Sequence, residues 1–153
     1  MDGNNRWSEK NSINPFDTYI KGSKKLLEIS EYVFSNFETQ YITAFALSKN
    51  NLKRTNEKIK MLKAVIKYFL EDLDTISKYK YRISIKGNLN FLSKRLINKI
   101  NELNSTNQKY KKTLFILVNY SGQDDILNSI TQLKQFKLKL NKTNFEKNLL
   151  LGS

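Results

Sequence analysis

The opening stretch Met1–Trp7, Met-Asp-Gly-Asn-Asn-Arg-Trp, holds the residues best suited to chemistry. Gly3 permits a left-handed backbone turn, and such a turn directs successive N–H groups toward one point where an anion can bind. Arg6 adds a planar guanidinium that matches phosphate oxygens, and Asp2 is a hard oxygen ligand of the kind that Mg²⁺ accepts beside phosphates. The stretch therefore predicts a diphosphate–Mg²⁺ site. The alternative is an ordinary frayed chain end that contains a turn.

The composition narrows the chemistry that the chain can perform. Its 153 residues fit one domain, and 39% hydrophobic residues suffice for a packed core. The sequence has no cysteine and no histidine. Disulfides, thiolate zinc sites, cysteine nucleophiles and histidine bases are therefore excluded. Any reaction must use carboxylates, amides, hydroxyls, Lys, Arg or an oxygen-bound metal.

The net charge of +13 indicates either an anionic partner or a bias in coding. Lysines occur in every segment, which favours coding bias over a designed patch. Nucleic-acid binding is the alternative, because Tyr79, Tyr81 and Tyr110 lie near lysines and could stack on bases. No run reaches the ~18 apolar residues of a membrane span, and the chain opens on polar residues. We expect a cytoplasmic protein, with peripheral membrane contact left open.

Apolar runs and helical periodicity alternate along the chain. Strands are expected over 40–47, 81–86 and 113–120. The first is expected to be covered on both faces, the second to have one wet face near the sheet edge, and the third to be central and covered on both faces. A short helix is expected to start near Asn5, and longer helices are expected over 22–37, 57–76 and 91–103. A further helix is expected to begin at Asp124 or Asp125 as its cap, and one more to lie within 144–151. The predicted fold is α/β: an open, mostly parallel sheet with helices on both faces. Loops at the carboxyl ends of such strands form ligand sites.

Two polar stretches, 48–54 and 119–123, each follow an apolar run. Together with Met1–Trp7, and in this order, they resemble the motifs of the cis-prenyltransferases, the undecaprenyl diphosphate synthase family. That family carries Met-Asp-Gly-Asn-x-Arg-Trp, then Phe-Ser-x-Glu-Asn-Trp-x-Arg-Pro, then Asn-Tyr-Gly-Gly-Arg. The resemblance covers nearly all of the chain.

The resemblance implies condensation of isopentenyl diphosphate with an allylic, farnesyl-type diphosphate. By resemblance, Asp2 binds Mg²⁺ and Asn51 helps to remove the proton, and these two are the expected catalytic residues. The residues expected to bind substrate are Gly3, Asn4, Asn5, Arg6, Trp7, Ser48 and Arg54. Most apolar residues of the helix over 57–76 are expected to pack in the core. The family grows its prenyl chain in a tunnel between helices and sheet, and the resemblance implies that some of Leu62, Val65 and Phe69 line it.

Several positions depart from the family pattern. Asn50 replaces a Glu, Leu52 a Trp, Tyr19 a His and Gln123 an Arg. The family also has an apolar strand before its first motif and an Asp-x-x-Ile-Arg-x-x-Gly-Glu segment after its third, and this sequence shows neither. The expectation is a single partial domain over 1–153, shortened at both ends, with weak or no activity alone. Partners consistent with this are a second copy or a complete homologue, and a non-catalytic pairing role is the alternative function.

Overall fold

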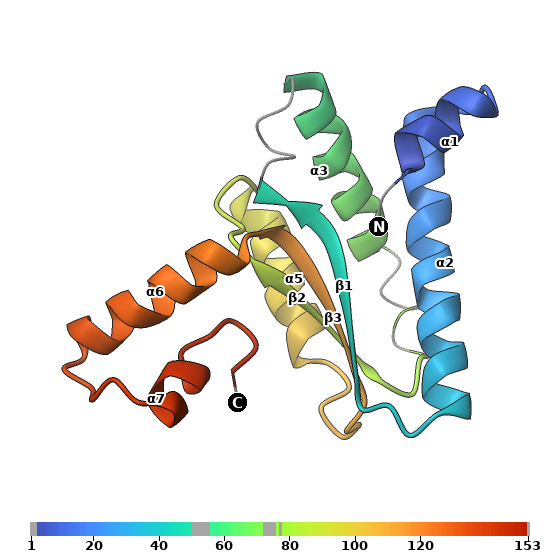
Figure 1. Cartoon of the computed structure of the whole chain (residues 1–153). Coiled ribbons are helices and arrows are strands. Elements are labelled where there is room, and N and C mark those ends of the chain that lie inside the picture. Colours follow the sequence, from blue (N-terminus) through green and yellow to red (C-terminus); the bar gives the residue numbers. More distant parts are fainter. Residues whose placement is uncertain (1–2, 50–55, 72–75, 77, 153) are drawn as a thin grey trace.

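The computed structural model of the chain describes residues 3–49, 56–71, 76 and 78–152. Three parallel strands form one sheet in the order β1-β3-β2 (Figure 1). They are β1 (Tyr41–Ser48), β2 (Arg82–Gly87) and β3 (Thr113–Tyr120). Thr113 is the register partner of both Tyr41 and Arg82, so the three strands start level. The predicted parallel α/β fold is confirmed.

Burial differs between the central and the outer strands. The central strand β3 has an apolar run, and Leu114 is fully buried within it. On β1, however, Tyr41 and Phe45 are 63% and 44% exposed, so the expectation that β1 is covered on both faces is wrong. The expected wet face of β2 is also corrected, because Ser84 is as buried as the flanking Ile83 and Ile85. The expected central place of 113–120 and the edge position of 81–86 are both confirmed by the strand order.

The helices before and between the strands begin where capping chemistry allows. Helix α2 (Pro15–Asn36) starts at Pro15 rather than Gly22, because proline suits the first helical position and the Asn14 side chain accepts the Phe16 N–H at 2.8 Å. Helix α3 (Asn56–Glu71) follows β1, and helix α5 (Lys94–Ser105) follows β2 with Ser93 as its cap.

One hydrophobic core lies between these helices and a single face of the sheet (Figure 1). Leu27 and Phe34 enter it from α2, Leu70 from α3 and Ile100 from α5. The alternate side chains of β3 complete it: Leu114, Ile116 and Val118. Because side chains alternate along a strand, Thr113 and Phe115 point to the opposite face of the sheet.

Helices α6 (Gly122–Gln135) and α7 (Lys142–Lys147) project away from the core (Figure 1). Helix α7 begins and ends earlier than the helix expected within 144–151, because Asn141 caps it by accepting the Asn144 N–H at 2.8 Å. The Ser129 hydroxyl of α6 donates to the Phe145 carbonyl at 2.9 Å and ties the two helices together. Within the described part of the chain, no helix is both long enough and apolar enough to cross a bilayer.

Tyr81 makes the stability of the fold sensitive to alkaline pH. Its hydroxyl donates to the Leu27 carbonyl at 3.3 Å, and burial, followed by the nearby Tyr79 and Glu31, raises its pKa above the ordinary 10.0. The unfolded chain therefore loses this proton first as pH rises above about 10. We expect the free energy of unfolding to fall by up to ~1.4 kcal/mol per pH unit there, and to be unaffected by this group below pH 10.

Urea unfolding between pH 8 and pH 11 measures this effect. In Tyr81→Phe the free energy of unfolding should fall less steeply above pH 10. Tyr32→Phe alters a tyrosine that is 62% exposed, and the fall should be as steep as in the unaltered chain. Identical slopes for the two variants would contradict the assignment.

Candidate functional site

The first motif forms a left-handed turn followed by a helix. Gly3 has φ 86° and precedes α1 (Asn4–Lys10), and the Trp7 N–H donates to the Gly3 carbonyl at 2.8 Å. The helix therefore starts within one residue of the predicted Asn5. The first N–H groups of a helix have no partners within it, so this turn suits an anion. Arg6 approaches the same turn, with a guanidinium nitrogen 3.9 Å from the position of a Cβ on Gly3.

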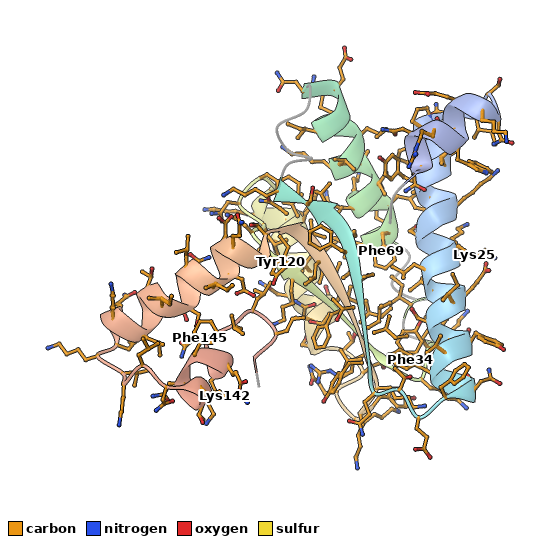
Figure 2. The ribbon with its side chains drawn as sticks, in the orientation of Figure 1. Lys25, Phe34, Phe69, Tyr120, Lys142 and Phe145 are labelled. Atoms are coloured by element: carbon orange, nitrogen blue, oxygen red, sulfur yellow. The ribbon has the colours of Figure 1, made fainter. Side chains whose placement is uncertain are left out.

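An apolar cavity of about 100 Å³ lies between the sheet and helices α2 and α3. Leu62, Val65 and Phe69 belong to its lining, and Leu62 is also part of the hydrophobic core. Figure 2 shows Phe69 in the space between the sheet and α2. Most of the remaining wall is aliphatic: Leu26, Ala46, Leu47, Ile66, Ile85, Ile100, Ile116 and Val118. The volume is below the ~150 Å³ of an engineered cavity that binds benzene, so a long prenyl tail would require the cavity to widen.

Polar groups of the first motif meet this cavity. Asn4 and Tyr19 are part of its lining, and the Tyr19 hydroxyl donates to the Asn5 side-chain oxygen at 3.3 Å. Trp7 is 45% exposed, and the Lys21 ammonium lies 5.7 Å from the centre of its ring. The first motif therefore meets the apolar cavity at Asn4, and Asn5 is tied to the cavity wall through Tyr19.

The second motif is only partly described. Asn51 and Arg54, like Asp2 of the first motif, lie outside the described residues. Ser48 lines a separate recess of about 330 Å³ with Tyr120 and Gln123, rather than the apolar cavity. The structure thus brings Asn4, Asn5 and Tyr19 together but places Ser48 among residues of the third motif.

The third motif opens helix α6 and fixes the carboxyl ends of two strands. The N-cap is Ser121, whose side chain accepts the Asp124 N–H at 3.4 Å, so the expected capping by Asp124 or Asp125 is wrong. Asp124 instead pairs with the Lys49 ammonium at 2.7 Å. Asp125 accepts hydrogen bonds from the Tyr120 hydroxyl at 3.0 Å and from the Leu150 N–H at 2.9 Å. Burial, and then the hydrogen bond to Asp125 and its charge, raise the pKa of Tyr120.

The ion pair and these hydrogen bonds account for both carboxylates of Asp124 and Asp125. Among residues 3–49, 56–71, 76 and 78–152, no group of three or more His, Cys, Asp or Glu side chains is placed to hold a metal ion.

Sequence reasoning missed one connection at the carboxyl edge of the sheet. The Asn119 side chain donates to the Asn88 carbonyl at 2.8 Å and joins the ends of β3 and β2. Asn119 has φ 51°, a left-handed conformation that asparagine tolerates better than most residues. An asparagine directly after the apolar run 114–118 was the available signal, but its partner lies 31 positions away.

Comparison with known proteins identifies relatives of this arrangement. A family model described as "Putative undecaprenyl diphosphate synthase" matches residues 1–153. "Dehydrodolichyl diphosphate synthase 3" of Arabidopsis thaliana is 32% identical over 129 residues, which cover 83% of this chain and 42% of that protein. "Tritrans,polycis-undecaprenyl-diphosphate synthase (GGDP specific)" of Sulfolobus acidocaldarius is 32% identical over 137 residues, which cover 86% and 52% of the two chains. The chain spans about half the length of the curated relatives it matches.

A solved structure shares the fold. The crystal structure of lavandulyl diphosphate synthase from Lavandula x intermedia, in complex with dimethylallyl diphosphate, matches with a TM-score of 0.82 and 22% identity. The match covers 98% of this chain and 68% of that one. At this identity the likeness supports the fold alone.

Proposed function

The chain belongs to the undecaprenyl diphosphate synthase family of prenyltransferases, and from this premise we propose that it binds an allylic diphosphate for condensation with isopentenyl diphosphate. The observation that carries the proposal is that the first motif meets the apolar cavity at Asn4. An allylic diphosphate is an amphiphile of matching polarity. Its diphosphate would lie at the Gly3–Arg6 turn, and its hydrocarbon tail would enter between α2 and α3 beside Val65 and Phe69.

Mg²⁺ fits the donor groups available in the first motif. This ion is commonly held by one or two carboxylates together with substrate phosphates. Asp2 supplies one carboxylate directly before the Gly3 turn, so Asp2 and the diphosphate would share the ion. When bound, Mg²⁺ offsets charge that develops on a departing diphosphate. Arg6 contributes positive charge at the same turn, and Asn51 is proposed to assist removal of the proton.

Two binding titrations and one assay test the proposal. A farnesyl diphosphate analogue with a non-reactive thiolo linkage should bind more tightly with Mg²⁺ than without it, and more tightly than inorganic diphosphate does. Transfer of radiolabelled isopentenyl diphosphate onto farnesyl diphosphate measures whether condensation follows binding. Equal affinity for the analogue and inorganic diphosphate would contradict the role of the apolar cavity.

Filling the cavity should weaken binding of the tail selectively. Val65→Phe adds a ring to the cavity lining, and we expect the affinity for the farnesyl analogue to fall about tenfold, the equivalent of roughly two methylene groups left unburied. Affinity for inorganic diphosphate should stay unchanged. Ala64→Phe is the matched control, because Ala64 is exposed on the same helix. Equal losses in the two variants would show that the tail does not use this cavity.

A pairing role is the second candidate, supported by apolar side chains exposed on and after α6. Leu127, Phe136 and Leu140 are 61%, 63% and 68% exposed. Such exposure in neighbouring elements favours a protein contact. Co-expression with a longer homologue followed by affinity capture tests this role, and recovery of the chain without the homologue would count against it.

A further inference from the structure

A second recess lies at the amino ends of the strands, the lower part of the sheet in Figure 1. Its volume is about 660 Å³, within the range of small-molecule sites, ~300–1,000 Å³. Thr113 and Phe115 of β3 form its floor, on the sheet face opposite to Leu114 and Ile116. The recess is therefore separated from the apolar cavity by the sheet itself.

The charged side chains around this recess are both cationic. Arg82 and Lys111 belong to its lining, and no Asp or Glu is present among its described lining residues. The Arg82 Nε is buried and has no hydrogen-bond partner among the described residues. A buried donor without an acceptor is costly, and the charge of the guanidinium beside the recess favours an anion there.

Aromatic side chains form the other part of the wall. The rings of Tyr41 and Phe115 stack with centroids 6.1 Å apart and an angle of 27° between planes. Tyr41 is nevertheless 63% exposed, so much of its ring remains accessible. Tyr110 also lines the recess, and the Lys109 ammonium lies 5.2 Å from the centre of its ring.

The three tyrosines expected to stack on bases lie in different surroundings in the structure. Tyr81 is buried and its ring packs against that of the half-buried Tyr79, with centroids 5.2 Å apart, so Tyr81 is not accessible to a base. That part of the nucleic-acid alternative is wrong. Tyr110 is the one of the three that lies beside the cationic recess.

From these observations we infer that the recess binds a mononucleotide: a planar aromatic base on Tyr41 and a phosphate between Arg82 and Lys111. Aromatic rings bind bases of any type by stacking, and guanidinium groups match phosphate oxygens. Thr43 and Gln108 add hydrogen-bonding groups on the same wall. The site does not share a residue with the apolar cavity, so its failure would leave the proposed prenyl diphosphate site unaffected.

Nuclear magnetic resonance titration of the ¹⁵N-labelled chain with adenosine monophosphate tests the inference. The amide signals of residues 41–43, 82 and 110–115 should shift with a single saturation curve. Inorganic phosphate and adenosine, each added alone, should shift subsets of the same signals at higher concentration. A thymidine oligonucleotide, added as a third ligand, distinguishes a free nucleotide site from a strand-binding groove: equal or tighter binding of the strand would overturn the mononucleotide assignment.

Matched variants separate this site from general attraction to a basic protein. Tyr41→Ala should lower the affinity for adenosine monophosphate about tenfold, and Lys111→Gln should lower it about threefold. Tyr32→Ala and Lys60→Gln make the same changes at exposed positions on α2 and α3, and both should bind as the unaltered chain does. Shifts spread over the lysines of all elements, or equal losses in the control variants, would overturn the inference.

Discussion

Replacing Gly87 with Ala is expected to remove about 3–5 kcal/mol of folding stability. Gly87 ends β2 with φ 137°, a backbone conformation that L side chains rarely adopt. An added Cβ would lie 1.7 Å from the Val118 carbonyl oxygen and 2.8 Å from its carbon, both of them backbone atoms of the central strand. The strained conformation costs ~1–3 kcal/mol, and separating β2 from β3 adds to it. The free energy of unfolding of a single domain is ~5–15 kcal/mol in total, so the variant should be close to unfolded.

Urea unfolding followed by circular dichroism at 222 nm measures the loss. Gly122→Ala is the control, because the nearest atom to its added Cβ is the Tyr120 hydroxyl oxygen at 3.9 Å. In the first turn of α6, alanine should be neutral or stabilising by up to ~1 kcal/mol. A loss below about 1 kcal/mol for Gly87→Ala would show that the two strands can separate at low cost. That result would also weaken the role of the Asn119–Asn88 hydrogen bond in fixing this edge.

Replacing Asp2 with Asn is expected to lower the Mg²⁺-dependent affinity for the farnesyl diphosphate analogue about a hundredfold. The substitution keeps the size of the side chain and removes the carboxylate proposed to share the metal with the diphosphate. Without Mg²⁺ the substitution should have no effect on the affinity or raise it slightly, because a carboxylate beside a diphosphate repels it. Titrations with and without Mg²⁺ therefore test the metal role itself.

Asp17→Asn provides the matched control for Asp2→Asn. Asp17 lies exposed in the first turn of α2, outside the first motif, and its loss should change affinity less than twofold in either condition. An equal loss for Asp2→Asn with and without Mg²⁺ would contradict a role through the metal. It would point to a role of Asp2 in the conformation of the turn.

The local sequence determined the elements and their order along the chain. Helical periodicity identified α3 and α5, and apolar runs identified β1 and β3, because both signals arise from neighbouring residues. The first motif also identified its own turn: Gly3 is followed by a helix within one residue of the expected start. Some of Leu62, Val65 and Phe69 were expected beside a cavity, and all three belong to the lining of one.

The tertiary structure decided how far each strand is covered, which carboxylates are paired and where each recess opens. At the same position in the register, Tyr41 of β1 is exposed and Thr113 of β3 is buried, although both belong to apolar sequence runs. The partners of Asp125 and Asn119 lie 25 and 31 positions away in sequence. Such contacts depend on how distant segments pack, and the periodicity of a single segment carries no information about its partners.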